Sequence, residues 1–331
     1  MRSPAIAALV FVCLALAACT TGPGLDALNS VGPSPETTSS IVRPSAVVPE
    51  GDGDGLVVEQ GDVGVTALAE PDIVTAAAAE KVALIAPAKP ASRPTPPAAG
   101  RKVMRQRFGD AHPINFGKVT PDDHAVHGVD VSRWQGDIDW VKLRGQGANF
   151  AWIKATDGGD HLDPLFKKNW RAAKAAGIPR GAYHFFYWCR SASSQADWFI
   201  RNVPKEKGAL PPVLDVEWNH LSACKKRPSR EIVLEKMRVF LDRLEKHYGQ
   251  RPVIYTAPDF YADNLKGAFP DHPFWLRSVA AHPSKVYPGR KWLFWQYSGS
   301  GLSQGVDGRI DLNVFRGDAG EWRKWLGRAA G

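Results

Sequence analysis

The segment PPVLDVEW at residues 211–218 contains two acids, Asp215 and Glu217, in an otherwise apolar run that is typical of a buried strand. Successive side chains of a strand point to opposite faces, so both carboxyl groups leave this strand on the same face. Burying two like charges together costs free energy, but their repulsion helps to keep one of them protonated, which separates an acid from a base. The pair therefore predicts acid–base catalysis, unless cations such as Lys154 or Arg277 neutralise both carboxylates.

The elements around this pair alternate between short apolar runs and amphipathic segments from about residue 127 onward. Alternating strands and helices predict a parallel sheet, and eight strand candidates predict a barrel. We therefore expect an α/β fold, an irregular TIM-like (β/α) barrel with five βα units followed by short strands. The strand candidates are HGVDVS, FAWIKAT, GAYHFFYW, PPVLDVEW, RPVIYTA, PFWLRS, KWLFWQYS and RIDLNVF.

Polar and aromatic residues stand near the ends of these strands, where barrels of this kind build their active sites. The convergence of so many on one mouth is hard to attribute to packing, and it favours a working acid cluster over simple ion pairing. His184, a single histidine on an apolar strand, is interpreted as a core residue. The residues at the strand ends are Asp130, Lys154, Tyr183, His184, Asp215, Glu217, Tyr255, Trp275, Gln296, Tyr297 and Asp311.

The ordered set of these segments resembles family 25 of the glycoside hydrolases, the bacterial and phage-type muramidases that cut peptidoglycan. The resemblance covers about residues 126–316 and rests on HGVDVSRWQGDIDW, FAWIKATDGGDHLDPLFKKNWRAAKAAGIPRGAYHFF, PPVLDVEW, VIYTA, KWLFWQYS and GRIDLNVF. It implies an irregular β/α barrel that hydrolyses the β-1,4 bond between N-acetylmuramic acid and N-acetylglucosamine. The family's acidic residues fall on Asp130, Asp215, Glu217 and Asp311.

The resemblance also places the family's aromatic and polar cleft residues on Tyr183, Tyr255, Trp275 and Gln296, and we expect Trp275 and Tyr297 to stack on sugar faces. Two segments depart from the family pattern. Asp157 stands where the family usually has Glu, and the stretch FWLRSVAAHPSK after the sixth strand matches poorly, which leaves the sugar contacts there undefined.

Glycoside hydrolysis needs a proton for the leaving oxygen and negative charge near the anomeric carbon. Glu217 has the longer reach and is the predicted general acid, while Asp215 orients the substrate's acetamido group or acts as base or nucleophile. Strand positions i and i+2 lie about 6.6 Å apart, between the retaining spacing of about 5–5.5 Å and the inverting range of about 6.5–9.5 Å. We favour assistance by the acetamido group, with the other two routes left open.

Other functions leave different signatures in a sequence. A lipid-tethered barrel that binds peptidoglycan without cutting it is the main alternative, although both Asp215 and Glu217 are present. A metal-dependent polysaccharide deacetylase would need clustered His and Asp ligands, and the histidines of the domain are scattered. The sequence predicts no metal site and no cofactor, and it contains no nucleic-acid-binding motif.

The N-terminus has the features of an export signal. Arg2 precedes a short apolar run that ends in Leu16-Ala17-Ala18-Cys19, which resembles a bacterial lipobox. We expect residues 1–18 to be a signal peptide and Cys19 to carry lipid, with an ordinary cleaved signal peptide as the alternative. Thr20 favours the periplasmic side of the outer membrane. Residues 19–124 are rich in Pro and Ala and predict a disordered tether, followed by the catalytic barrel at residues 125–331.

The charge divides between these parts. Residues 1–100 hold five Lys and Arg against ten Asp and Glu, whereas residues 101–331 hold 37 against 24 and are strongly basic. Anionic cell-wall polymers are the expected complement, and we predict a monomer that binds peptidoglycan and reaches the membrane through Cys19. Cys189 and Cys224 follow neighbouring strands, so in an oxidising compartment we expect them to form a disulfide at the mouth; two free thiols are the alternative.

Overall fold

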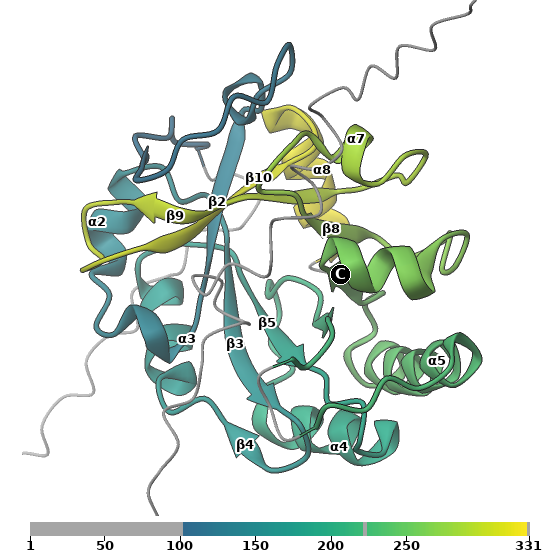
Figure 1. Cartoon of the computed structure of the whole chain (residues 1–331). Coiled ribbons are helices and arrows are strands. Elements are labelled where there is room, and N and C mark those ends of the chain that lie inside the picture. The colour runs from purple at the N-terminus through teal and green to yellow at the C-terminus, as the bar shows by residue number, and fades with distance from the viewer. Residues whose placement is uncertain (1–101, 221–223, 330–331) are drawn as a thin grey trace, which may run out of the picture. The chain divides into compact units, whose positions relative to one another are not determined.

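The computed structural model describes residues 102–220 and 224–329 (Figure 1). The predicted signal peptide, the lipidation site at Cys19 and most of the predicted tether lie outside these residues. Within the described ranges, no helix has the length and apolar character needed to cross a membrane.

Eight strands of the sheet close into a barrel, because β10, the last of the eight along the chain, pairs with β2, the first of them. Neighbouring strands are parallel from β2 to β9, and β10 is antiparallel to both of its neighbours. The predicted irregular α/β barrel is confirmed. The strands are β2 (Val126–Val131), β3 (Ala151–Asp157), β5 (Arg180–Phe185), β6 (Val213–Val216), β7 (Val253–Thr256), β8 (Phe274–Arg277), β9 (Phe294–Leu302) and β10 (Ile310–Phe315).

The connections explain why β10 is reversed. Full helices follow the early strands, but only short helical turns follow β7 and β8, and a turn at residues 303–309 joins β9 to β10. A parallel crossover needs a dozen or more residues, so β10 must run back along β9. This reversal belongs to the short strands that were expected to follow the five βα units. The helices are α2 (Trp140–Gly145), α3 (Phe166–Ala175), α4 (Ala192–Asn202), α5 (Arg230–Tyr248), α6 (Pro258–Phe260), η4 (Tyr261–Leu265) and α7 (Pro283–Val286).

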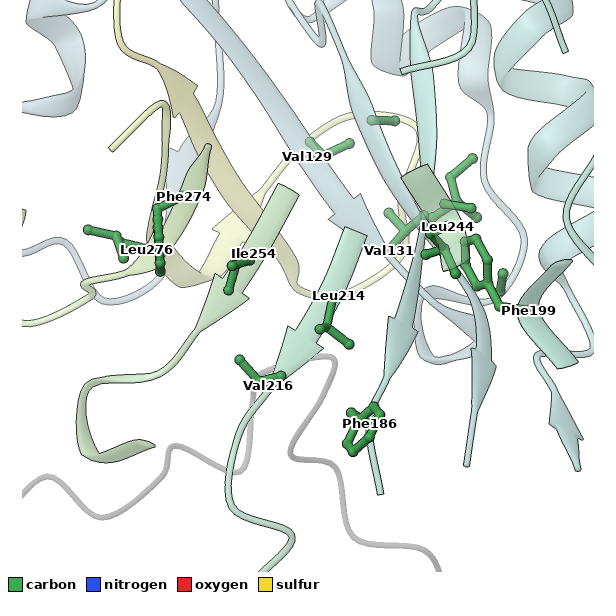
Figure 2. Close-up of a cluster of buried hydrophobic side chains, with 14 of the residues drawn as sticks. Val129, Val131, Phe186, Phe199, Leu214, Val216, Leu244, Ile254, Phe274 and Leu276 are labelled. Atoms are coloured by element: carbon green, nitrogen blue, oxygen red, sulfur yellow. The ribbon is translucent and has the colours of Figure 1, made fainter. Parts of the chain in front are cut away.

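Strand alternation divides the apolar side chains into two cores. Outward-facing residues such as Val129, Leu214 and Leu276 pack beneath the surrounding helices, where Phe199 of α4 and Leu244 of α5 join them (Figure 2). Inward-facing residues fill the barrel and include many rings. This inner core comprises Val126, Phe150, Trp152, Tyr183, Leu210, Val213, Val253, Tyr255, Trp275, Phe294, Phe315, Trp322 and Leu326.

Helix α8 (Ala319–Ala329) closes the end of the barrel at which the parallel strands begin. Its Trp322 ring lies 5.5 Å from the ring of Phe150 and 5.0 Å from that of Phe315. With this end sealed, the other end is the place where polar side chains can meet a ligand. We call that end, at which the parallel strands terminate, the mouth.

A glycine makes room for the largest ring of the inner core. A Cβ atom added to Gly181 on β5 would lie 2.1 Å from the Trp152 ring, which is closer than any contact between carbon atoms. The Trp152 ring therefore occupies the volume that a side chain at position 181 would need. Any larger residue at this position would push the ring out of the centre of the barrel.

The residues just before β2 belong to the fold. Strand β1 (Gly109–Asp110) pairs antiparallel with β9, and the Phe116 ring packs edge-on against Trp295 at 4.9 Å. Upstream of them, the backbone of Gln106 passes so near Gly147 that an added Cβ would lie 2.5 Å from it. The predicted domain start at residue 125 is therefore too late, because Pro and Gly in this segment obscured the few apolar residues that pack.

Candidate active site

Asp215 lies on β6 and Glu217 directly follows it, and the side chains are only 2% and 7% exposed. The backbone carbonyl of Glu217 accepts a 2.7 Å hydrogen bond from Trp188 Nε1. The Trp188 ring is stacked on Phe260 at 4.9 Å, which fixes the indole and hence this end of the strand. The two acids are thus held in place by packing as well as by the sheet.

The electrostatics of the pair centre on Asp215. Burial, followed by the negative charge of Glu217, raises the pKa of Asp215 well above its usual value, and the Lys154 ammonium opposes this shift. The same repulsion that was expected to keep Glu217 protonated thus acts on the pKa of Asp215, the more deeply buried partner. The free protein therefore holds a proton at Asp215 to higher pH than an exposed carboxyl group would.

This raised pKa predicts how stability depends on pH. Asp215 keeps its proton in the folded protein after the unfolded chain has lost it, so stability falls as pH rises from the ordinary Asp pKa of about 3.9 towards the folded value. Asp215→Asn removes this loss. We expect the melting temperature of Asp215→Asn to exceed that of the wild type by more at pH 8 than at pH 4. Each 1 kcal/mol of added stability corresponds to a rise of about 2–4 °C for a domain of this size. Calorimetry at both pH values measures this, and an equal difference at both would contradict the raised pKa.

Asp130 lies at the centre of a hydrogen-bond network at the mouth. Its Oδ1 atom accepts hydrogen bonds from Gln296 Nε2 at 2.9 Å and from Asn313 Nδ2 at 2.7 Å. Gln296 Oε1 in turn accepts a 2.8 Å bond from the Tyr255 hydroxyl, and Asn313 Oδ1 accepts a 2.7 Å bond from Trp275 Nε1. These bonds fix the position of the Asp130 carboxylate. Its negative charge contributes to the raised pKa of Asp215.

Asp311 reaches the same site from a strand of opposite direction. It pairs directly with Asp130 across β10 and β2, and it is 1% exposed. Residues opposite each other in an antiparallel pair have Cβ atoms about 4.5–5.5 Å apart and point to the same face. Asp311 was expected at the C-terminal end of a parallel strand. It instead stands near the start of β10, and it lies at the mouth because that strand runs backwards.

Lys154 and Arg277, the two cations that could neutralise the acid pair, have different surroundings. Lys154 forms an ion pair with Asp157, at 3.0 Å between Nζ and Oδ2, while its charge still lowers the pKa of Asp215. Among the described residues, Arg277 makes no ion pair, and its Nε and Nη2 atoms make no hydrogen bond. Simple neutralisation therefore does not account for the pair Asp215 and Glu217.

Three of the predicted aromatic residues face the inside of the barrel. Tyr183 and Tyr255 lie on the inward face with Trp275, and the Tyr255 ring centroid is 4.5 Å from that of Trp275. Trp275 is 2% exposed and stacks on Trp152 at 5.7 Å, so its faces are covered by protein, and its predicted stacking on sugars is not supported by this packing.

Tyr297 does not join the site. Strand alternation turns it outward from β9, where its ring lies 5.9 Å from that of His127 and 6.1 Å from that of Trp295. The prediction that Tyr297 stacks on a sugar at the mouth is therefore wrong in position, because its neighbour Gln296 takes the inward face. Asn313 was missed, although its spacing of two from Asp311 already placed it on the same face.

His184 is a core residue, as predicted. It is fully buried between Thr156 Oγ1, 2.7 Å from Nδ1, and Gln195 Oε1, 3.1 Å from Nε2, and its ring stacks on Phe240 at 4.9 Å. Burial lowers the pKa of His184 to about 4. The ring is thus neutral near pH 7 and lies on the outer side of the strands. Within the described part of the chain, no group of three or more His, Cys, Asp or Glu could hold a metal ion.

Cys189 and Cys224 form a disulfide, with Cα atoms 5.5 Å apart. They follow β5 and β6, so the bond connects two loops at the mouth. Nearby, Asn219 donates from Nδ2 to the carbonyl of Phe186 at 3.1 Å, which adds a second link between the same loops. The expected pairing is confirmed, and it fixes the chain that continues from Glu217.

Comparison with known proteins places this site in a family. The sequence profile of glycosyl hydrolases family 25 matches residues 129–306, more than half of the 331 residues. The chain belongs to glycosyl hydrolase family 25. The match contains Asp130, Asp215 and Glu217, whereas Asp311 lies just beyond its end.

Relatives of this family 25 chain include proteins with and without a described activity. It is 39% identical over 220 residues to the uncharacterized protein YegX of Escherichia coli K12, covering 64% of this chain and 77% of YegX. It is 36% identical over 210 residues to lysozyme M1 of Streptomyces globisporus, covering 60% of this chain and 70% of the lysozyme. A solved family 25 glycosyl hydrolase from Bacillus anthracis matches with a TM-score of 0.60 at 42% identity, covering 65% of this chain and 99% of that one.

Proposed function

We propose that the chain is an exported muramidase, which hydrolyses the β-1,4 bond between N-acetylmuramic acid and N-acetylglucosamine in peptidoglycan. The observation that carries this proposal is the inward-facing pair Asp215 and Glu217 at the mouth of a family 25 barrel. Membership of the family and the similarity to lysozyme M1 support the choice of substrate.

Glu217 has the role of general acid in this proposal. It delivers a proton to the glycosidic oxygen as the bond to the anomeric carbon breaks, which lowers the barrier for a poor leaving group. Its carboxyl group reaches further from the strand than that of Asp215, and Trp188 fixes its backbone. Asp130 and Asp311 add negative charge on the opposite side of the barrel, near where positive charge develops on the sugar.

Asp215 is proposed to orient the acetamido group of the substrate. Its Oδ1 atom is buried and has no hydrogen-bond partner among the described residues, so it can accept a bond from the N–H of that group. The acetamido oxygen then attacks the anomeric carbon, which makes a separate protein nucleophile unnecessary. Direct attack by Asp215, or its action as a base on water, are the competing routes, and the anomeric configuration of the first product separates retention from inversion.

A barrel that only binds peptidoglycan is the alternative, since YegX, at 39% identity, has no described activity. The two functions differ in one simple assay. A muramidase clears a suspension of purified peptidoglycan in the presence of a chelator, because no step requires a metal. Binding to the suspension without any fall in turbidity would support the alternative and contradict the proposed hydrolysis.

We also propose that Cys19 carries the lipid that anchors the protein, as the sequence LAAC indicates. Cys19→Ser then moves the protein from the membrane fraction to the soluble fraction, or leaves it unprocessed, and abolishes labelling by a fatty acid. Cys13→Ser, within the predicted signal peptide, is the matched control and leaves the fractionation unchanged. Unaltered membrane association and labelling of the Cys19→Ser protein would rule out this anchor.

A further inference from the structure

Arg277 is a buried cation that has no role in the proposed reaction. It is the last residue of β8 and is 7% exposed. The Nε and Nη2 atoms of its guanidinium are both buried and make no hydrogen bond within residues 102–220 and 224–329. A buried charge without partners is costly, and folded proteins retain such a group where a ligand completes its hydrogen bonds.

Strand register places Arg277 at the same height as the general acid. Val216, Thr256 and Leu276 are Cα partners across β6, β7 and β8. The residues that follow these three along the chain are Glu217, just past β6, Ala257, just past β7, and Arg277, the last residue of β8. Neighbouring strands lie about 4.8 Å apart, so Glu217 and Arg277 are roughly 10 Å apart across the small side chain of Ala257.

The Arg277 side chain points to the inward face. Arg277 is the Cα partner of Gln296, whose side chain reaches Asp130 and Tyr255 inside the barrel. Alternation along β8 agrees, because Trp275 lies in the inner core and Leu276 in the outer one. The charge of Glu217 contributes to raising the pKa of the Tyr255 and Tyr287 hydroxyl groups, and the charge of Arg277 opposes this rise. Both effects are consistent with a shared position of Glu217 and Arg277 at the mouth.

We propose that Arg277 binds a carboxylate carried by the muramoyl residue of the glycan, next to the bond that is cut. A guanidinium offers parallel N–H donors that match the two oxygens of a carboxylate, and such charge-assisted pairs are strong and directional. This proposal rests on the proposed function, and it identifies Arg277 as a specificity-determining residue. Arg277 also lies in the stretch FWLRSVAAHPSK, which matches the family 25 pattern poorly.

Two carboxylates of peptidoglycan have this chemistry. One is the lactyl carboxylate of muramic acid, which is free when the stem peptide has been removed. The other belongs to the stem peptide itself. Chitin oligosaccharides have the same β-1,4 linkage and acetamido groups but carry neither carboxylate, so they serve as the matched ligand control.

The test measures binding in the Glu217→Gln background, which removes the general acid and preserves the ligands. The probes are peptide-free muramoyl oligosaccharides, the same oligosaccharides bearing stem peptides, and chitotetraose. Isothermal titration gives the dissociation constant of each probe with and without Arg277→Gln. Arg323→Gln, an exposed arginine on α8 at the closed end of the barrel, is the control for the loss of one positive charge.

We expect Arg277→Gln to weaken binding of a carboxylate-bearing probe about 10- to 100-fold, the range for hydrogen bonds to charged groups, and to leave chitotetraose unchanged. Selective loss with the peptide-free probe identifies the lactyl carboxylate, and selective loss with the peptide-bearing probe identifies the stem. Arg277→Lys, which keeps the charge but not the paired donors, should fall between. The Arg277→Gln protein should melt no lower than its parent, because it loses an unpartnered buried charge.

Several outcomes overturn the proposal: no change with any probe, equal losses that include chitotetraose, no binding of any probe, or unfolding of Arg277→Gln, which would make the residue structural. Failure of the proposed function has a different signature. In that case the Arg277-dependent binding is present, but the wild-type protein does not cut the muramoyl oligosaccharides that it binds.

Discussion

Glu217→Gln lowers the rate of peptidoglycan hydrolysis by about 10²–10⁴-fold, the usual loss when one general acid is removed, while the barrel remains folded. The amide has the shape of the carboxyl group but no proton to give to the glycosidic oxygen. The Trp188 bond is made to the backbone of residue 217, so the substitution leaves that support intact. Release of soluble fragments per enzyme, measured in the initial phase, gives the rate.

Glu235→Gln is the matched control, because it makes the same chemical change at an exposed position of α5. It should hydrolyse peptidoglycan at the wild-type rate. A Glu217→Gln protein that turns over within about threefold of the wild type would remove Glu217 from the role of general acid, since the expected loss is at least tenfold greater than that. Circular dichroism and melting of both variants exclude unfolding as the cause of a loss.

Replacing both Cys189 and Cys224 by Ser lowers the free energy of unfolding by about 4 kcal/mol on the chain-entropy model of cross-links. The bond joins residues separated by 35 positions, so its loss releases a long loop in the unfolded chain. For a domain of this size the melting temperature falls by about 8–16 °C. Urea unfolding of the wild type and the double variant, each with and without reductant, measures the difference.

Reductant should not change the free energy of unfolding of the double variant, and the reduced wild type should have the same free energy of unfolding as the double variant. A difference below about 1 kcal/mol between the oxidised and reduced wild type would show that the bond contributes little to stability. Because the bond also holds the chain that follows Glu217, we expect the reduced protein to lose hydrolytic activity below its melting temperature.

The sequence was sufficient for the barrel because its signals are local. Alternating strands and helices predict parallel pairing, and the spacing of two between Asp215 and Glu217 fixes a common face without knowledge of any other residue. The same reasoning would have found Asn313 from Asp311. The buried position of His184 followed from its apolar strand in the same way.

The failures lie where position depends on distant contacts or on the length of a connection. The turn between β9 and β10 is too short for a crossover, and this reverses β10 and changes how Asp311 arrives at the mouth. Tyr297 and Gln296 are neighbours, and only the register with Asp130 decides which of them faces inward. Similarly, Phe116 becomes part of the fold only through its contact with Trp295, nearly 180 residues away.

The protonation of the acids was the least predictable feature. The sequence led us to expect that repulsion keeps Glu217 protonated, but the pKa of each acid also depends on its burial, and burial depends on every element around the mouth. In the free protein, burial and then the charge of Glu217 raise the pKa of Asp215. A substrate that donates its acetamido N–H to Asp215 favours the ionised form of that group, which would leave the proton of the pair to Glu217.

The most direct measurement of the central claim is mass spectrometry of peptidoglycan fragments released by the purified protein and then reduced with borohydride. Reduction marks the sugar at each newly formed reducing end. A muramidase gives fragments that end in N-acetylmuramitol, and Glu217→Gln gives almost none. Fragments that end in N-acetylglucosaminitol, or intact glycan chains after prolonged incubation with the wild-type protein, would contradict the proposed cleavage of the bond between N-acetylmuramic acid and N-acetylglucosamine.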